Sequence, residues 1–316
     1  MQRWGKTNSG TQRWFCQNCQ KSGVRRNPFQ SERHKKALFV KWICGNATLS
    51  ETAEKVGVEI RTLQRWFEPF WNSAPLPEAP WSLDNQTLIL DAVSIEPRSM
   101  MALIGRTPKH VVWWLFAETE SYESWNMFCS KLPMPSAVVC DGQRGLSAAI
   151  RLRWPSTLFQ RCLIHVVRHS LGKLTLKPKT LAGQDLRKLV RQLLIVRTRR
   201  QKRRWIRCWK HWYSKYHRFL AERSHGDVQN KKRGWWYTHK KLRAVRSLVQ
   251  NSLPHLFTFI GHPEIPRTSN YVEGGINSRL KELLHRHRGL SLARKQVLVS
   301  WFLSQKQPKK PTRNVY

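Results

Sequence analysis

Acidic residues are scarce in this chain of 316 residues: 19 Asp and Glu stand against 57 Lys and Arg, a net charge of +38. Long apolar runs are missing as well, since none approaches the roughly 20 residues that span a bilayer. The N-terminus, MQRWGKTNSG, has no apolar stretch behind its charges, which argues against a signal peptide. An acidic metabolic enzyme, a membrane protein and a secreted protein are all poor fits.

Cysteine is sparse too, and the seven residues are an odd number that does not suit a disulfide framework. Reduced thiols or metal ligands fit better. Intrinsic disorder is excluded by what the chain does contain: 40% of its residues are hydrophobic and 16 are Trp. Its length predicts two or more domains with a sizeable core.

The excess of Lys and Arg predicts a polyanionic partner, and nucleic acid is the first candidate because phosphate neutralisation gives affinity for any sequence. A basic protein on a membrane surface is the alternative. Such proteins concentrate their charge in one amphipathic helix or tail, whereas here it runs through the whole chain. We therefore expect an intracellular protein with no membrane partner.

Residues 1–30 contain Cys16-x-x-Cys19, which is half of the ligand set of a zinc ribbon. The segment QRWGKTNSGTQRWFCQNC resembles the end of a zinc ribbon, so residues 1–30 are interpreted as a partial zinc-ribbon-like segment. We expect the domain to start before Met1. Cys16 and Cys19 would then bind Zn²⁺ together with a first Cys pair. The alternative is a knuckle without metal.

Residues 31–72 predict three short helices with the pattern of a helix-turn-helix DNA-binding domain. Thr48 and Glu51 have the spacing of a capping box, and Gly57 provides the turn before the last helix. The start of that helix is where base edges are contacted in this motif. Its candidate DNA contacts are Arg61, Thr62, Gln64 and Arg65.

The rest of the chain divides by composition. Residues 73–85 are a Pro-rich linker, and in 86–171 apolar runs of strand length alternate with helices, which predicts an α/β domain with a mixed sheet. Residues 172–262 contain only three acids, and we expect them to be helical throughout. Residues 263–305 return to amphipathic helix, before a basic tail over 306–316.

Three of the few acids are candidates for chemistry. Asp91 follows the apolar run TLIL and Asp141 follows AVVC, and a carboxylate at the end of a buried strand is costly unless it is paired or binds a metal. Glu273 is the third. Turn or N-cap roles for the two Asp, and a capping box with Asn270 for Glu273, are the alternatives. Taken together, the acids favour a Mg²⁺ site for phosphoryl transfer.

Three segments together resemble a DDE transposase of the Mutator-like kind, as carried by bacterial insertion sequences: LILDAVSI, VVCDGQRGLSAAI followed by RCLIHVVR, and TSNYVEGGINSRLK. The resemblance covers residues 80–305. It implies a ribonuclease H-like core in which Asp91, Asp141 and Glu273 are the catalytic acids, the first at the end of the first strand. The 132 positions from Asp141 to Glu273 exceed one crossover, and the resemblance implies an all-helical insertion there.

The same resemblance makes Cys162 and His165 supports of the active site. The alternative is a buried Cys and a His bonded to backbone. Lys281 lies eight residues after Glu273, about two helical turns, so that it points the same way and could hold the DNA backbone. A solvated lysine is the alternative there.

Trp205, Trp209 and Trp212 recur on one helix face. They either pack the core of the insertion or stack on an unpaired base, with Trp209 as the candidate base contact. The basic residues interleaved with them are expected to face phosphate: Lys202, Arg203, Arg204 and Arg207.

The resemblance therefore implies a transposase that binds the terminal inverted repeats of its element and a target duplex, as a homo-oligomer in the bacterial cytoplasm at the nucleoid. Two Mg²⁺ or Mn²⁺ ions would activate a water for nicking and then the freed 3′ hydroxyl for strand transfer. Two alternatives stay open: a DNA-binding regulator with an inactive core, and a ribonuclease H-like nuclease or resolvase.

Overall fold

The computed structural model describes residues 1–8, 10–24, 31–226, 234–269 and 276–308. Its contacts divide the chain into two compact units, Met1–Leu76 with Gly289–Gln305, and Pro77–Arg288 with the residues from Lys306 onward. None of the helices in the described ranges combines the length and the apolar character needed to cross a membrane.

The first unit begins with an antiparallel sheet in the order β1-β2-β3, made of β1 (Gln2–Lys6), β2 (Gln12–Phe15) and β3 (Ser22–Val24). The Trp4 and Phe15 rings stack across the β1–β2 pair, with their centroids 4.8 Å apart. Cys16 and Cys19 lie in the turn between β2 and β3. The CxxC knuckle is thus carried by a sheet of three short strands.

Three helices follow where the sequence predicts them: α1 (Glu32–Ile43), α2 (Leu49–Val56) and α3 (Ile60–Trp71). The predicted capping box is present, because Glu51 N–H donates to Thr48 Oγ1 at 3.1 Å and Thr48 N–H donates to the Glu51 carboxylate at 2.8 Å. Gly57 ends α2 with a φ of 72°, a left-handed conformation that favours glycine.

The helix α12 (Leu292–Ser304) belongs to this first unit. Trp301 is buried against Phe39, with ring centroids 5.7 Å apart, and its indole N–H donates to the Phe70 carbonyl at 3.0 Å. The sequence predicts that residues 263–305 are the last helices of the catalytic core. The structure divides that stretch, because the apolar face of α12 packs on α1 and α3.

The second unit is built on a mixed sheet in the order β6-β5-β4-β7-β8. Its strands are β4 (Thr87–Glu96), β5 (Met100–Arg106), β6 (Val111–Ala117), β7 (Ala137–Cys140) and β8 (Leu158–Arg161). β4, β5 and β6 are antiparallel neighbours, whereas β7 pairs parallel with β4 and β8 parallel with β7. The predicted α/β class with a mixed sheet is confirmed.

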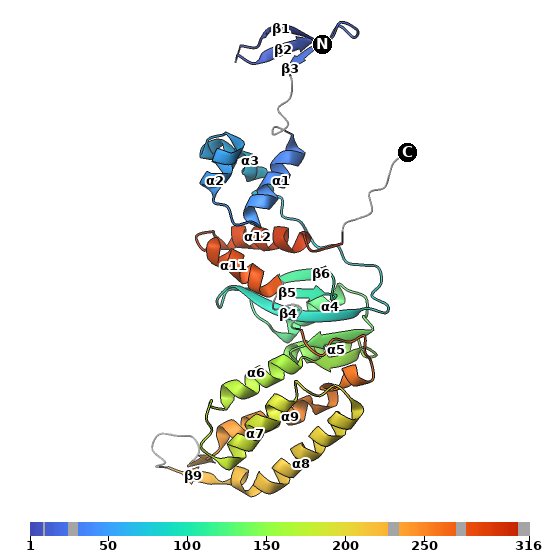
Figure 1. Ribbon diagram of the computed structural model, residues 1–316, viewed down its shortest axis with the longest axis vertical. Helices are drawn as coiled ribbons and strands as arrows, with labels where there is room; N and C mark the ends of the chain where they lie inside the picture. The colour runs from blue at the N-terminus through green and yellow to red at the C-terminus, as the bar shows by residue number, and fades with distance from the viewer. Residues whose placement is uncertain (9, 25–30, 227–233, 270–275, 309–316) are drawn as a thin grey trace. The chain divides into compact units, whose positions relative to one another are not determined.

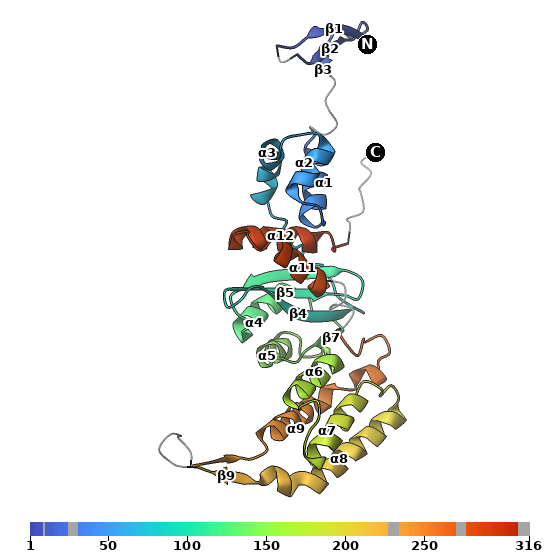
Figure 2. The ribbon, with the colours of Figure 1, turned by 60° about the vertical axis from the view of Figure 1, so that its left-hand side comes forward.

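The two faces of this sheet are covered differently (Figure 2). Helices α4 (Tyr122–Ser130) and α5 (Arg144–Arg153) cover one face, where Leu88 and Leu90 of β4 pack with Trp125. Helix α11 (Ser278–Arg286) contacts β4 from the other side. Because side chains alternate along a strand, Asp91 shares the face of Ile89, on the side of α11.

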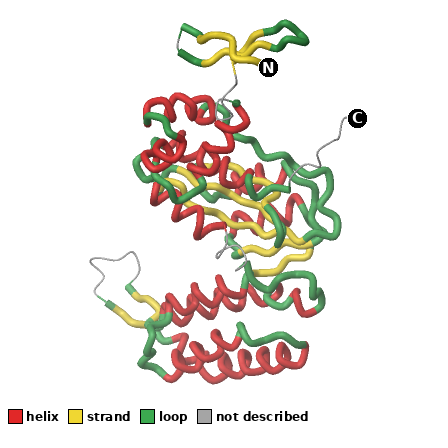
Figure 3. The backbone as a smooth tube through the Cα atoms, turned by 45° about the horizontal axis from the view of Figure 1, so that its top comes forward, coloured by secondary structure: helices red, strands yellow, loops and turns green. Residues whose placement is uncertain are grey.

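Four helices form the basic region: α6 (Leu163–Lys173), α7 (Leu181–Gln192), α8 (Arg199–Ala221) and α9 (Lys240–Ser252) (Figure 3). Trp205, Trp209 and Trp212 of α8 are buried in their common core. Each indole N–H has an acceptor: the Leu189 carbonyl, the Gln250 side chain and the Ala182 carbonyl respectively. Packing, rather than base stacking by Trp209, accounts for this stripe.

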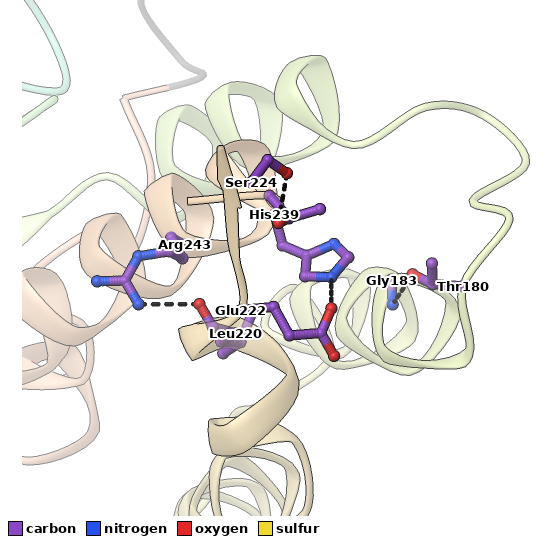
Figure 4. A network of polar contacts seen from close by, with 8 residues as sticks. Thr180, Gly183, Leu220, Glu222, Ser224, His239 and Arg243 are labelled. Atoms are coloured by element: carbon purple, nitrogen blue, oxygen red, sulfur yellow. Dashed lines mark hydrogen bonds and ion pairs between the residues drawn. The ribbon is translucent and has the colours of Figure 1, made fainter. Parts of the chain in front are cut away.

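Contrary to the prediction, residues 172–262 are not helical throughout. A hairpin of β9 (Arg223–His225) and β10 (Trp235–Tyr237) follows α8. Aromatic residues suit a strand, and here the Arg223 guanidinium covers the Trp235 ring at 4.1 Å and Arg243 covers Tyr237 at 3.5 Å. Beside them His239 contacts the Glu222 carboxylate at 2.9 Å (Figure 4).

Replacement of Trp212 by Ala is expected to lower the free energy of unfolding by about 3–5 kcal/mol, because it empties a buried site and removes a hydrogen bond. Urea denaturation followed by circular dichroism measures this loss. Arg203→Ala is the control, since Arg203 is exposed on the same helix. Similar losses in the two variants would contradict the packing role of the Trp stripe.

Candidate active site

Asp91 and Asp141 are brought to the same level by strand pairing. Ile89 of β4 pairs with Val139 of β7, and each Asp lies two residues beyond its member of that pair. Since β4 and β7 are parallel neighbours, both carboxylates lie at the same edge of their shared ladder. β7 ends at Cys140, but β4 continues past Asp91 to Glu96. The expectation that Asp91 ends its strand is therefore wrong.

The Asp91 carboxylate is mostly buried and accepts two hydrogen bonds. The N–H of Ala92 donates to Oδ1 at 2.9 Å, and the side-chain amide of Asn277 donates to Oδ2 at 2.6 Å. Burial raises the pKa of Asp91 above its usual range, and the charge of Asp141 adds to this, while His165 and the two donors oppose it. An ionised Asp91 therefore needs positive charge beside it.

Asp141 is held by the turn that follows β7. The N–H of Gln143 donates to Asp141 Oδ1 at 2.8 Å, and the Arg161 guanidinium donates to the Asp141 carbonyl at 3.0 Å. Gly142 has a φ of 76°, and a Cβ there would lie 2.6 Å from Arg161 Nε. Glycine is therefore favoured at 142, because another residue would be strained at this φ and would displace the Arg161 side chain.

Cys162 and His165 lie next to the two Asp and interact with each other. Burial raises the pKa of the Cys162 thiol, but hydrogen bonds from His165 and Ser269 outweigh it and leave the pKa lowered. The Cys162 hydrogen bond raises the pKa of His165 to about 9, against burial and with help from Asp91 and Asp141. His165 is thus cationic at neutral pH and supplies positive charge to the acids.

Glu273 lies outside the described residues, so its position stays a prediction. Its described flanks both contact the site. Ser269 donates from its N–H and its hydroxyl to Cys162 Sγ, each at 3.2 Å, and Asn277 donates to Asp91. Seven residues connect these two anchors.

Sequence reasoning missed Glu120, which lies just before α4 and close to both Asp. The Gln143 side chain donates to the Glu120 carbonyl at 2.7 Å, which ties this residue to the turn of Asp141. Burial, then Asp141, then Asp91 raise the pKa of Glu120 to about 7. Glu120 follows a strand only after a short loop, so the pattern of an acid directly after an apolar run could not reveal it.

The donor atoms of the site fit a hard divalent cation. They are carboxylate oxygens together with Asn277 Oδ1, which is buried and has no hydrogen-bond partner among the described residues. Within the described ranges, no three His, Cys, Asp or Glu side chains converge closely enough to hold a metal.

The other predicted residues lie on separate elements. Lys281 is exposed on α11, one helical turn beyond Asn277. On α3, Arg61, Gln64 and Arg65 are exposed and Thr62 is half-buried, with Arg65 contacting the Thr62 hydroxyl at 3.5 Å. Their DNA contacts remain predictions.

The four predicted phosphate contacts of α8 differ in their surroundings. Lys202 is half-buried, with its ammonium 5.6 Å from the centre of the Phe257 ring. Arg203 is exposed, and Arg204 and Arg207 line a groove between α7 and α8. The phosphate contacts of all four residues remain predictions.

The pKa of the half-buried Cys16 thiol is lowered mainly by a hydrogen bond from the backbone N–H of Cys19, with help from the Cys19 side chain and from Asn18. The knuckle thus favours a thiolate, the form that binds metal. The two Cys side chains are fewer than the four ligands that a structural zinc site needs.

A family model described as "Transposase, Mutator family" matches residues 107–229 of this chain. The match includes Asp141, Cys162 and His165, but neither Asp91 nor Glu273. A relative from Corynebacterium diphtheriae, described as a probable transposase for an insertion sequence element, is 31% identical over 65 residues. That alignment covers 19% of this chain and 19% of the relative.

Glu120→Gln tests the charge of the site through the pH dependence of stability. Because the pKa of Glu120 is raised in the folded chain, the neutral form stabilises the fold below the unfolded pKa, and this stability is lost as pH rises through about 7. Without divalent cations, the unfolding midpoint of the variant minus that of the parent should therefore rise from pH 5 to pH 8.

Glu123→Gln is the control for this experiment. Glu123 is exposed in the first turn of α4, and a hydrogen bond from Ser121 lowers its pKa, so the same difference should stay flat or fall with pH. A flat profile for Glu120→Gln would show that Glu120 lies apart from the two Asp.

Proposed function

From the match of residues 107–229 to the model of the Mutator-family transposases and the similarity to an insertion-sequence relative, we propose that this chain is a DDE transposase. It would cut DNA at the ends of its element and join the freed end to a target. One structural observation carries the proposal: the in-register pairing of β4 with β7 sets Asp91 and Asp141 at one sheet edge.

The sheet order supports a ribonuclease H-like core. Three antiparallel strands, β6-β5-β4, are extended by β7 and β8 parallel to β4, and the helical region begins at α6, directly after β8. This order places the first and the second acid on neighbouring strands. Glu273 would complete the site from the segment that leads into α11.

Asp91, Asp141 and Glu273 would hold the divalent cations. When bound, these ions activate the attacking oxygen and stabilise the leaving oxygen of a phosphodiester. The chain's own contribution is orientation and charge balance. Asn277 fixes one oxygen of Asp91, the Gln143 N–H fixes one oxygen of Asp141, and cationic His165 offsets their repulsion.

Two displacements at phosphorus would follow. In the first, water forms a bond to phosphorus and the bond to a 3′ oxygen breaks, which leaves a 3′ hydroxyl. In the second, that hydroxyl attacks a target phosphodiester and releases another 3′ oxygen. Positioning and charge neutralisation suffice for both, so no covalent intermediate with the protein is required.

The N-terminal unit would recognise the element. The exposed side chains at the start of α3 are Arg61, Gln64 and Arg65, with Leu63 and Phe67 buried beneath them. A helix-turn-helix presents the N-terminal part of its second helix to the major groove, where Arg and Gln read base edges. A homo-oligomer bound to both element ends would bring two such units to the DNA.

Asp91→Asn, Asp141→Asn and Glu273→Gln are each expected to abolish nicking and strand transfer, while duplex affinity is kept. The reason is that each carboxylate supplies charge that holds the metals used in both steps. Cleavage of a labelled element end in Mg²⁺ measures the first step, and joining of a precut 3′-hydroxyl end measures the second.

Glu282→Gln is the control, since Glu282 pairs with Arg279 and Arg286 on the exposed face of α11. It should cleave at a rate close to that of the parent. Cleavage that survives Glu273→Gln would overturn the three-acid mechanism. Cleavage without joining in the parent would indicate a nuclease or resolvase instead.

Arg61→Ala with Arg65→Ala should weaken binding to the element end more than binding to random duplex. Loss of base contacts removes discrimination worth about 1–3 kcal/mol for each good pair, while backbone contacts remain. Competition binding at fixed salt gives the ratio of the two affinities. An unchanged ratio would remove α3 as the recognition helix.

A further inference from the structure

The helical region contains a groove of about 750 Å³ between α7 and α8. None of its lining residues belongs to the candidate active site. Its side chains include five basic residues and one acid, which are Lys188, Arg204, Arg207, His211, Lys215 and Asp185. Leu189 and Trp212 form part of its apolar floor.

Hydrogen bonds between α7 and α8 fix the position of the two helices that form the groove. The Trp205 indole N–H donates to the Leu189 carbonyl at 2.9 Å, and Trp212 donates to the Ala182 carbonyl at 3.0 Å. Both Trp side chains are buried and α8 runs beside α7 (Figure 1). Little order would have to be gained when a ligand enters.

Most of the positive charge in the groove is available to a ligand. Asp185 accepts a hydrogen bond from the Tyr216 hydroxyl at 2.8 Å and lies 3.9 Å from the Lys215 ammonium, so Lys215 offsets its charge. Lys188, Arg204 and Arg207 are exposed, and none of them forms an ion pair within the part of the chain that the structure describes.

The spacing along α8 suits a nucleic-acid strand. The groove residues from Arg204 to Lys215 recur every three or four positions, so they share one face and extend about 16 Å along the axis. A strand of duplex DNA has one phosphate per 3.4 Å of axis, so this length faces about five phosphates.

We propose that the groove between α7 and α8 binds the sugar-phosphate backbone of one strand of duplex DNA, through Lys188, Arg204 and Arg207. This deepens the proposed function, on which it rests for the identity of the polyanion. Because the contacts are to phosphate, binding here is independent of DNA sequence and positions the duplex without reading it.

The groove divides the basic residues of α8 into those that line it and those that do not, a difference that composition alone does not show. Arg199, Arg200 and Lys210 are exposed on the same helix α8 but do not line the groove. If α8 were only a solvated basic surface, these residues would contribute to DNA binding as much as the groove residues do. If the groove binds DNA, the residues that line it should contribute more to DNA affinity than the exposed residues outside it.

Two variants of the full chain with equal charge test the difference. Lys188→Ala, Arg204→Ala and Arg207→Ala together remove one Lys and two Arg from the groove, and Arg199→Ala, Arg200→Ala and Lys210→Ala remove the same charge outside it. The groove variant should bind a random-sequence duplex at least tenfold more weakly, and the slope of log affinity against log salt should shrink by about 2 to 3. The control should lose no more than about threefold.

Cys208 offers a direct readout, because it is exposed and lines the groove. Alkylation of Cys208 by N-ethylmaleimide, followed by peptide mass spectrometry, should slow at least fivefold when the random duplex is bound. The groove variant should lose this protection at a DNA concentration that still protects Cys208 in the control. Circular dichroism of both variants confirms that they are folded.

Equal affinity losses in the two variants, or no protection of Cys208, would overturn the proposal. Stronger protection by polyglutamate than by duplex would do the same, since it would make the partner an acidic protein. If Asp91-dependent cleavage persists while the groove variant behaves like the control, the groove fails and the transposase proposal stands. If the duplex protects Cys208 but the parent does not cleave DNA, the groove proposal stands and the transposase proposal fails.

Discussion

The parallel pairing of β4 with β7 is the constraint on which the acidic site depends. Ile89 and Val139 are partners in this ladder, and a shift of one residue would move Asp91 to the opposite face of the sheet. The buried apolar residues on both faces of β4 fix the register. The turn at Gly142, which no other residue could adopt without meeting Arg161, then holds Asp141 at the same level.

The protein carries opposite charges at two places: carboxylates gather around Asp91 and Asp141, and Lys and Arg gather on α8. In the acidic site, burial and mutual repulsion raise the pKa of Asp91 and of Glu120, and cationic His165 compensates only in part. A cation is therefore the favoured occupant. Helix α8 carries exposed Arg and Lys and no Asp or Glu, so an anion is favoured there. A phosphodiester with bound metal ions has both kinds of charge.

The helical region shows how a strongly basic segment can still fold. Its Trp residues bury large apolar surfaces and satisfy their indole N–H groups with carbonyl or amide oxygens, while the Arg residues of α8 and all its Lys except half-buried Lys202 stay in solvent. Hydrophobic burial from one face thus offsets the repulsion on the other. The Arg–aromatic contacts around β10 extend this principle to the hairpin.

The sequence by itself determined the strands of the sheet, the helices of residues 31–72 with their capping box, and the two Asp, because these depend on local periodicity and on an acid beside an apolar run. It missed Glu120, the β9–β10 hairpin and the packing of α12 with α1. Each of these depends on a partner that is not a close neighbour in sequence: Asp141 for Glu120, Arg223 for Tyr237 and Phe39 for Trp301. Only the tertiary structure decided that the Trp residues of α8 pack in the core and that Arg204 and Arg207 line the groove. A helical repeat shows which residues share a face, but it does not show what covers that face.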